Sequence, residues 1–204
     1  MPSPERPRAR RLVLCATGAY QVFTLPGFVL ALLRHAADDV RVVLSASAAR
    51  LVSVAAVEAA SHHAVLVGGS GEDEAAAEIG QEADLVVVYP ATVNVVAKLA
   101  SGIADDAVCG VVLSTAAPVV VVPFGNPKMW AAPAAASALS RLQEIGYAVL
   151  PPLSGVEVAT REGLNAATEP FPLPTLLARM GAALRAPGMG RAHRAGAPAG
   201  DGTS

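Results

Sequence analysis

The stretch "LVVVYPATVNVVAKLASGIADD" (Leu85–Asp106) decides the fold that this sequence predicts. It opens with the apolar run Leu85–Val88, which predicts a strand buried on both faces of a sheet. Pro90 is predicted to end this strand because proline cannot donate a hydrogen bond to the ladder. A segment of helical length follows, and Thr92 is its predicted N-cap. A buried strand followed at once by a capped helix is typical of a parallel α/β sheet.

The same alternation of short apolar runs and helical segments extends over most of the chain. The predicted strands are Leu12–Cys15, Val40–Leu44, Ala64–Val67, Leu85–Val88, Val119–Val122 and Ala148–Leu150. The predicted helices are Val22–Ala36, Ala48–Ala60, Asp73–Glu82, Val93–Ser101 with a continuation toward Ser114, and Met129–Ile145. This order predicts a single α/β domain with a Rossmann-like (flavodoxin-like), doubly wound parallel sheet. In such sheets, ligands bind beyond the carboxyl ends of the strands.

Two tails and one aperiodic segment complete the predicted organisation. Residues 1–10 are rich in proline and arginine and are predicted to form a disordered arm. Residues 186–204 are rich in glycine, alanine and proline and are predicted to form a disordered tail. The domain is predicted to span residues 11–185, with a flexible flap at about residues 151–170.

The composition excludes several classes of protein. The chain has 204 residues, of which 53% are hydrophobic and 16% charged, so it has the apolar content for a large core. The formal net charge of −2 gives no basic field for nucleic acid. No apolar run has the roughly 18 residues that a membrane span needs. Cys15 and Cys109 form neither a disulfide framework nor a zinc motif. We therefore expect a cytoplasmic protein that binds neither nucleic acid nor membranes and holds no metal.

Two loops at the predicted carboxyl ends offer groups for an anion. Thr17 and Gly18 follow the first strand, where a turn into a helix can present backbone N–H groups to a phosphate. Ser45 and Ser47 follow the second strand, and one of them is expected to cap the next helix. On these residues alone, a plain turn at the first loop and simple capping at the second remain open.

The loop after the fifth strand, "PFGNPKMW" (Pro123–Trp130), holds another polar group. Asn126 lies between a glycine and a proline, so it is held in a turn from which its amide can bind a carboxylate. Met129 and Trp130 are large apolar residues at the same end of the sheet. On their own, they favour a place in the core over a ligand wall.

Together, these two motifs resemble those of the homo-oligomeric, flavin-containing cysteine decarboxylases. Pro90–Val95 is similar to the family's PASANT signature, and its PxMNxxMW signature is matched by Pro123, Asn126, Met129 and Trp130. The resemblance extends over roughly residues 11–152. It is closest to the lantibiotic peptidyl-cysteine decarboxylases, which are related to phosphopantothenoylcysteine decarboxylase.

This resemblance implies that the protein binds FMN, or FAD, which shares the same ring and ribityl phosphate. It assigns the ring to the PASANT-like segment, which offers Pro90, Ala91, Thr92 and Asn94. It assigns the phosphate to the loops that offer Thr17, Gly18, Ser45 and Ser47. It makes Asn126 the catalytic residue that binds the substrate carboxylate, with Met129 and Trp130 also binding substrate.

The resemblance also implies the partners and the reaction. The partners are a precursor peptide that ends in cysteine and further copies of the chain, assembled as a trimer or a dodecamer. The substrate thiol forms a thiolate, hydride passes from its Cβ to flavin N5, and the resulting thioaldehyde lets CO₂ leave as an enethiolate remains.

Three departures from the family separate the hypotheses. The family's catalytic histidine lies fourteen residues before the PASANT proline, a position that Ala76 occupies here. Gly125 replaces the methionine of PxMN, which removes a side chain beside the expected carboxylate site. The segment "LSGVEVATREGLNAA" (Leu153–Ala167) has no cysteine, whereas the coenzyme A branch has one in its flap that reduces the enethiolate.

The leading hypothesis is therefore oxidative decarboxylation of the C-terminal cysteine of a lanthipeptide-type precursor peptide. The product is an enethiol that leads to S-aminovinyl-cysteine. The alternatives are phosphopantothenoylcysteine decarboxylase, which gives a saturated product, and a non-catalytic flavin-binding regulatory protein, which Ala76 would suit. A nicotinamide-binding Rossmann protein is disfavoured because the chain lacks GxGxxG and an acidic residue after the second strand.

Overall fold

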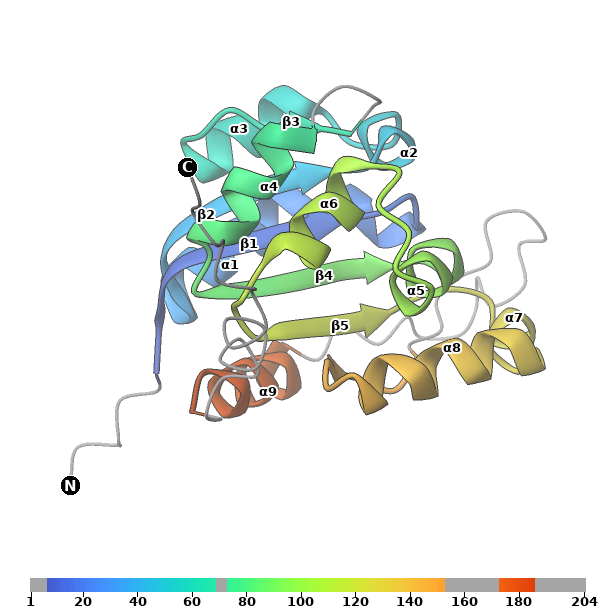
Figure 1. The fold of residues 1–204 in the computed structure, drawn as a ribbon. Coiled ribbons are helices and arrows are strands. Elements are labelled where there is room, and N and C mark those ends of the chain that lie inside the picture. Colours follow the sequence, from blue (N-terminus) through green and yellow to red (C-terminus); the bar gives the residue numbers. More distant parts are fainter. Residues whose placement is uncertain (1–6, 69–72, 153–172, 186–204) are drawn as a thin grey trace, which may run out of the picture.

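The computed structural model describes residues 7–68, 73–152 and 173–185. Its centre is a six-stranded parallel sheet with the order β3-β2-β1-β4-β5-β6 (Figure 1). The strands are β1 (Ala9–Ala16), β2 (Ala37–Leu44), β3 (Leu66–Val67), β4 (Leu85–Ala91), β5 (Val119–Pro123) and β6 (Ala148–Val149). This order is typical of doubly wound sheets that bind dinucleotides. The predicted Rossmann-like, doubly wound α/β sheet is confirmed.

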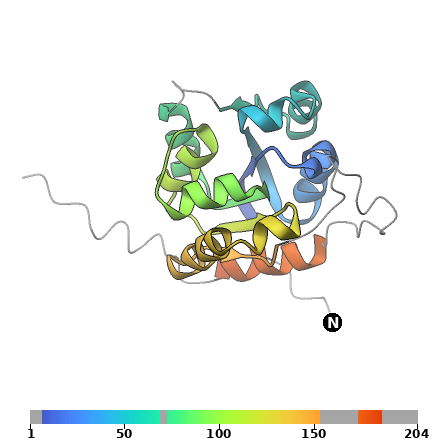
Figure 2. The same ribbon diagram turned by 90° about the vertical axis from the view of Figure 1, so that its right-hand side faces the viewer.

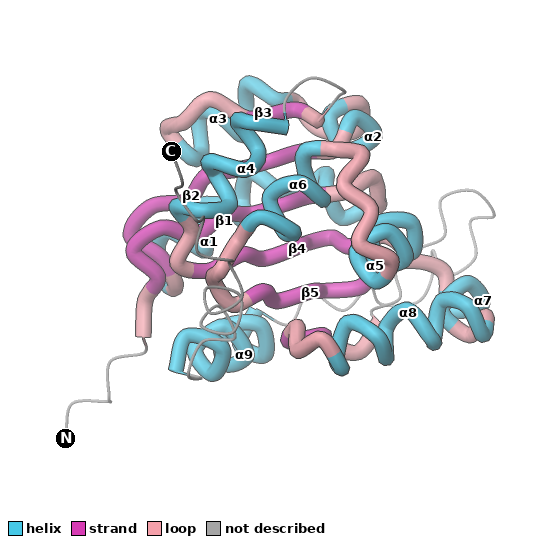
Figure 3. Tube along the Cα trace, in the orientation of Figure 1, coloured by secondary structure: helices cyan, strands magenta, loops and turns pink. Residues whose placement is uncertain are grey.

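Helices cover both faces of the sheet (Figure 3). They are the 3₁₀ helix η1 (Tyr20–Thr24), α1 (Leu25–His35), α2 (Ala46–Ala49), α3 (Val54–Ser61), α4 (Asp73–Glu82), α5 (Val93–Ala100), α6 (Ala107–Ser114), α7 (Pro127–Trp130), α8 (Pro133–Glu144) and α9 (Leu173–Arg185). One hydrophobic core contains buried side chains of α1, α3 and α9. The other contains those of α4, α5, α6 and α8.

The central strand β4 contributes to both cores. Successive side chains of a strand point to opposite faces, so Leu85 and Val87 join the first core, and Val86 and Val88 join the second. All of β4 is buried. Burial of a large apolar side chain stabilises the fold by about 1.5–3 kcal/mol, so the continuous apolar run predicted as a strand also anchors both helical layers.

Three of the predicted helices are divided in the structure. The segment Val93–Ser114 is interrupted at Gly102, whose φ of 70° lies in the left-handed region that glycine adopts without penalty. Ser53 caps α3 and separates it from α2. Pro133 begins α8 after the short helix α7. Each division lies at a residue type that favours a helix end.

The ends of the domain differ from the predicted boundaries. β1 begins at Ala9, so the end of the predicted arm belongs to the sheet. Arg8 pairs with Asp38 (Nε to Oδ1, 2.9 Å), and its guanidinium donates to the Leu33 and Arg34 carbonyls at the end of α1. Helix α9 was not predicted. The rest of the predicted arm, the predicted tail and nearly all of the predicted flap lie outside the described residues.

The arrows of β4 and β5 point to the right in Figure 1, and Figure 2 shows that side face on. We name it the carboxyl edge, meaning the loops that follow Ala16, Leu44, Ala91 and Pro123. The amino edge is the opposite end of the strands. The strand order reverses between β1 and β4, which is where doubly wound sheets bind ligands. Within the described residues, no helix combines the length and apolar character that crossing a membrane requires.

Candidate functional site

The loops after β1 and β4 are joined where the strand order reverses. Thr17 N donates to the Pro90 carbonyl (3.1 Å), and Thr17 Oγ1 donates to the same oxygen (2.7 Å). Thr17 Oγ1 also accepts from Thr92 N (2.9 Å). Thr17 is only 4% exposed, so these bonds are shielded from water. The Thr17 hydroxyl therefore fixes the position of the PASANT-like loop.

The loops after β4 and β5 are joined by the main chain. β4 extends to Ala91, so Pro90 does not end the strand as predicted. A shift of register follows Val88, and Ala91 then pairs with Pro123 of β5. The shift lets the ladder continue without an N–H from Pro90. Phe124 N donates to the Ala91 carbonyl (2.9 Å). The two motifs identified in the sequence, Pro90–Val95 and Pro123–Trp130, therefore lie side by side and form one wall of the site.

The loops after β1 and β2 touch at Gly18. A Cβ on Gly18 would lie 2.5 Å from Ser47 Oγ and 2.7 Å from Ser47 Cβ, so this approach requires glycine. Ser45 Oγ accepts from Ala48 N (3.2 Å) and lies 3.0 Å from Ser47 Oγ. The expected capping role of Ser45 is confirmed. The structure thus brings the residues predicted for the phosphate into one cluster of hydroxyl and main-chain groups.

Asn126 occupies the turn after β5. Its Oδ1 accepts from Lys128 N (2.8 Å), which makes it the N-cap of α7 and fixes the orientation of its amide. Trp130 is 6% exposed and packs in the core with α5 and α8, whereas Met129 is 53% exposed. Asn94 is exposed in the first turn of α5. The core placement favoured by the sequence therefore holds for Trp130 and is wrong for Met129.

Two buried polar atoms of these loops have no hydrogen-bond partner among the described residues. They are Gln21 Oε1 in η1, after β1, and Trp130 Nε1 in α7, after β5; a third such atom, Arg41 Nε, belongs to β2. A Cβ on Gly125 would lie 3.3 Å from Trp130 Nε1, so no side chain covers the indole N–H from that position. A buried polar group without a partner costs about 1–3 kcal/mol. A ligand with complementary groups would remove that cost.

The ionisable groups beneath this edge are uncharged at neutral pH. Burial raises the pKa of the Cys15 thiol, and the nearby Cys109 thiol raises it further. Burial and the nearby Asp106 carboxylate raise the pKa of Cys109 to about 12. Burial raises the pKa of Tyr89 to about 12, against the effect of a hydrogen bond with Thr24. All three groups keep their protons, so none supplies a base or a thiolate.

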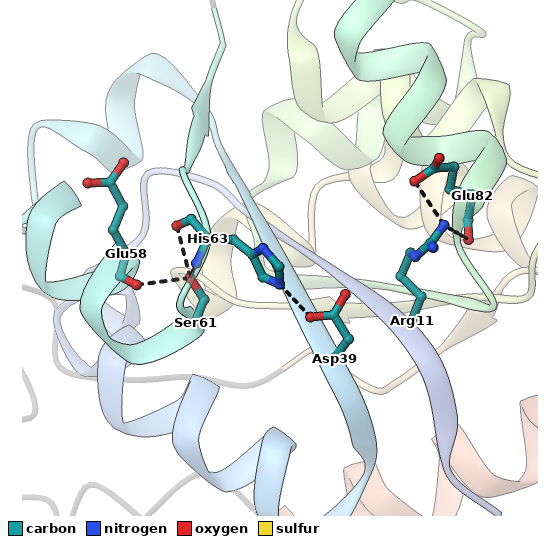
Figure 4. A network of polar contacts seen from close by, with 6 residues as sticks. All are labelled: Arg11, Asp39, Glu58, Ser61, His63 and Glu82. Atoms are coloured by element: carbon teal, nitrogen blue, oxygen red, sulfur yellow. Dashed lines mark hydrogen bonds and ion pairs between the residues drawn. The ribbon is translucent and has the colours of Figure 1, made fainter.

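The position of the expected histidine is closed by packing. Ala76 is fully buried on α4, and a Cβ on Gly110 of α6 would lie 3.1 Å from the Ala76 Cβ. The helices thus leave no room for a larger side chain. Among the described residues, His35 is the last residue of α1, and His62 and His63 follow α3; both helices run back toward the amino edge. His63 Nε2 contacts Asp39 Oδ1 there (2.5 Å; Figure 4).

The amino edge contains a pocket lined by charged side chains. Its volume is about 410 Å³, and it is lined by Arg10, Arg11, Asp38, Asp39, Glu82 and Asp84. Arg11 Nη1 pairs with Glu82 Oε2 (2.8 Å), as Figure 4 shows, and Arg11 N donates to Asp84 Oδ2 (2.9 Å). Because most of these charged groups already have a partner in the protein, the pocket is a network of surface ion pairs. We therefore place the site at the carboxyl edge.

Asp105 and Asp106 have structural partners. Asp106 caps α6 by accepting from Cys109 N (2.9 Å). Lys98 Nζ lies 2.7 Å from Asp105 and 3.1 Å from Asp106. The side chains of Asp105, Asp106 and Cys109 are close enough to hold a metal ion. Lys98 already pairs with both carboxylates, so their proximity is explained without a metal ion.

The comparison with protein families decides the identity of this site. The sequence profile described as Flavoprotein matches residues 1–172. The chain belongs to the Flavoprotein family. Within that family, the coenzyme A biosynthesis bifunctional protein CoaBC of Bacillus subtilis is 33% identical over 165 residues, which cover 79% of this chain and 40% of that protein. CoaBC of Mycolicibacterium smegmatis is 36% identical over 151 residues, covering 72% and 36%. The chain spans less than half the length of these curated relatives.

Solved structures of Flavoprotein-family members share the fold. The FMN-dependent cysteine decarboxylase SpaF is 30% identical, with a TM-score of 0.67 over 86% of this chain and 95% of SpaF. A phosphopantothenoylcysteine decarboxylase mutant complexed with pantothenoylaminoethenethiol is 22% identical, with a TM-score of 0.64 over 76% and 87% of the chains, and supports the fold alone. The predicted resemblance to the flavin-containing cysteine decarboxylases is confirmed.

Gln21 is the residue of this edge that sequence reasoning missed. It stands in "GAYQVFTLP", a polar side chain among apolar residues shortly after the Thr17–Gly18 turn. Glutamine is usually exposed, but this side chain is only 9% exposed. The signal available in the sequence was a polar residue within an apolar segment close to a predicted ligand loop.

Proposed function

We propose that this protein is an FMN-dependent decarboxylase that oxidises the C-terminal cysteine of a ribosomal, lanthipeptide-type precursor peptide to an enethiol. That product leads to S-aminovinyl-cysteine. The observation that carries the proposal is the hydrogen bond from Phe124 N to the Ala91 carbonyl, because it joins the two motifs into one wall. The similarity to SpaF over most of both chains supports the same reaction class.

The residues at the carboxyl edge fit FMN. The hydroxyls of Ser45 and Ser47 lie beside Gly18, where a Cβ is excluded, and they offer donors to a phosphate. The segment Pro90–Thr92, fixed by Thr17, offers main-chain groups to the ring. Gln21 Oε1 and Trp130 Nε1 supply an acceptor and a donor that have no partner among residues 7–68, 73–152 and 173–185. Asn94 is exposed and is assigned to the ring by the resemblance alone.

The protein's part in the reaction is to bind and orient. Bound FMN supplies the acceptor for the hydride that leaves the cysteine Cβ. Asn126 binds the terminal carboxylate, because Lys128 N fixes its amide in the turn of the second motif. Met129, which is exposed after that turn, takes the substrate's apolar part, and Trp130 is assigned to the substrate by the resemblance alone. Correct placement of the carboxylate aligns the carbon–carbon bond that breaks.

The thiol proton has no histidine to receive it in the part of the carboxyl edge that the structure describes. Ala76 is buried, and the described histidines lie toward the other edge. We therefore assign deprotonation of the substrate thiol to solvent. A thiol with a pKa of about 8.5 is mostly protonated at neutral pH. The rate of decarboxylation is then expected to rise with pH through that value.

The cysteines of the chain favour an oxidised product. The chain has two cysteines, Cys15 and Cys109, and both are fully buried with raised pKa values. Neither supplies the thiolate that the coenzyme A branch uses to reduce its enethiolate. This supports the peptide substrate over phosphopantothenoylcysteine.

The test mixes the flavin-loaded protein with a peptide that ends in cysteine. We expect the peptide to lose one carbon dioxide and two hydrogens, and without oxygen one equivalent of peptide should bleach the flavin. Asn126→Ala should abolish the mass change while flavin stays bound, and a peptide with a C-terminal serine is the matched substrate control. Unchanged mass with several candidate precursors would contradict the proposal.

Two alternatives are separated in the same assay. The similarity to CoaBC is an argument for phosphopantothenoylcysteine as the substrate of this protein. That reaction would give a saturated product without net bleaching of the flavin. Ala76, in place of the expected histidine, is an argument for a non-catalytic flavin-binding regulatory protein. Such a protein would stay yellow with every cysteine-terminated substrate. The trimer or dodecamer remains a prediction, which the mass of the native assembly in solution would test.

A further inference from the structure

Gln21 is buried without a partner at the carboxyl edge. Its side chain is 9% exposed, and Oε1 has no hydrogen-bond partner within residues 7–68, 73–152 and 173–185. The main chain around it is well fixed, since Thr24 Oγ1 donates to the Gln21 carbonyl (2.9 Å) and Val22 N donates to the Ala19 carbonyl (3.0 Å). Gln21 Oε1 therefore has no partner among the described residues although the main chain that carries the side chain is held in place.

Gln21 lies close in sequence to residues that contact both the Pro90–Thr92 segment and Ser47. It lies four residues after Thr17, whose side chain holds Pro90 and Thr92. It lies three residues after Gly18, which touches Ser47. The η1 helix therefore directly follows the β1 loop, whose residues contact both the Pro90–Thr92 segment and Ser47. A ligand that contacts both regions would lie next to this loop.

The chemistry of FMN decides which of its groups an amide at this position would meet. The phosphate presents acceptors, so it cannot satisfy a carbonyl oxygen. The ribityl hydroxyls connect phosphate to ring, and each of them both donates and accepts. A hydroxyl can pair with either end of the glutamine amide, which exchanges Oε1 and Nε2 by a half-turn of its last torsion.

We propose that the Gln21 amide accepts a hydrogen bond from a ribityl hydroxyl of bound FMN and is a determinant of flavin affinity. The inference rests on the flavin binding in the proposed function and is independent of the substrate. An unpaired buried carbonyl destabilises the apoprotein by its desolvation cost. If FMN supplies the partner, that cost is removed in the FMN complex, so binding is favoured by the same amount. Gln21 thus couples flavin binding to the stability of the β1 loop.

The test measures the dissociation constant of FMN by fluorescence titration of apoprotein, together with its thermal midpoint. Gln21→Met keeps nearly the same length and removes the hydrogen-bonding groups. We expect FMN to bind about 10-fold more weakly, while the apoprotein is as stable as wild type or more stable. Gln143→Met is the matched control, because Gln143 is exposed on α8, and its affinity should be unchanged.

The outcomes separate this inference from the proposed function. If wild-type apoprotein does not bind FMN, the proposed function fails with it. If wild type binds and Gln21→Met binds as tightly, only the role of Gln21 is overturned. Gln21→Leu is the second variant. If both variants lower the stability of the apoprotein or fail to fold, the amide has a partner within the protein, such as an internal water, and the inference is wrong.

Discussion

At the amino edge of the sheet, charged side chains pair with one another at the surface, whereas at the carboxyl edge buried hydroxyl and main-chain groups join the loops. Arg8 with Asp38 and Arg11 with Glu82 are ion pairs whose side chains are 38–62% exposed. At the carboxyl edge, Thr17 is 4% exposed, and its bonds hold the β4 loop. Exposed ion pairs thus connect the chain at one end of the strands, and buried hydrogen bonds connect it at the other end.

The difference teaches where function lies in this molecule. The amino edge has the charges and a pocket of about 410 Å³, yet most of its groups already have partners in the protein. The carboxyl edge has fewer charges, but Gln21 and Trp130 each present a buried polar atom that has no partner in the part of the chain that the structure describes. Unsatisfied groups, rather than charge, mark the place where a ligand completes the structure.

The largest effect should follow from filling the contact between Gly18 and Ser47. In Gly18→Ala, the new Cβ would lie 2.5 Å from Ser47 Oγ, so the loops must separate. We expect FMN binding, measured by fluorescence titration, to weaken about 100-fold. Gly27→Ala is the control, because nothing lies within 4 Å of that position. Ser47→Gly in the Gly18→Ala background should restore part of the affinity, and no recovery would contradict the contact as its cause.

The second effect is a loss of stability in alkali that originates in the core beneath the carboxyl edge. Cys109 and Tyr89 have ordinary pKa values of 9.0 and 10.0 and folded values of about 12, so the folded state keeps protons that the unfolded state loses. The free energy of unfolding should therefore be constant below pH 9 and fall as pH rises toward 12. Each retained proton contributes at most about 1.4 kcal/mol per pH unit. Urea unfolding along a pH series checks this, and Cys109→Ala should make the fall shallower.

The third effect concerns the bond that joins the β1 and β4 loops. Thr17→Val keeps the shape of the side chain, but it leaves the Thr92 N–H without its acceptor and removes one donor to the Pro90 carbonyl. We expect the free energy of unfolding to fall by about 1–3 kcal/mol and FMN to bind more weakly. Urea denaturation of both forms measures this. Thr17→Ser retains the hydroxyl and should behave nearly as wild type; equal losses in both variants would argue against the hydrogen bonds.

The smallest effect is expected at the amino edge. Arg11→Met removes the ion pair with Glu82 but keeps an unbranched side chain. Because this pair is partly exposed, the free energy of unfolding should change by less than about 1 kcal/mol. The dissociation constant of FMN should not change. A loss of flavin affinity here would show that the two edges are coupled and would remove the contrast between them.

Much of the sheet was predictable because its apolar runs are short and nearly continuous. The ends of the predicted strands are confirmed to within a few residues, and the sheet is parallel as predicted. The extension of β4 past Pro90 was not predictable, because it depends on a register shift that pairs Ala91 with Pro123. Helix α9 was missed because its pattern lies among proline- and glycine-rich segments, and its helical state depends on packing against the sheet through Leu176 and Met180.

The candidate site was predictable as a set of loops and not as a set of contacts. Residue type and strand order placed Thr17, Ser47 and Asn126 at one edge. Sequence could not show that the Thr17 hydroxyl binds the β4 loop, since those residues are 73 to 75 positions apart. It also could not show that Gln21 is buried, because burial of a polar side chain depends on the tertiary structure.

The hydrogen bond from Phe124 N to the Ala91 carbonyl has an evolutionary consequence. Main-chain atoms are the same whatever the side chains, so the two motifs keep their places while individual positions change. Ala76 and Gly125 stand where the resemblance leads one to expect histidine and methionine, yet the loops still meet. Side chains of the two loops can therefore be exchanged without loss of this main-chain bond, and a laboratory library restricted to those side chains would keep the two loops together.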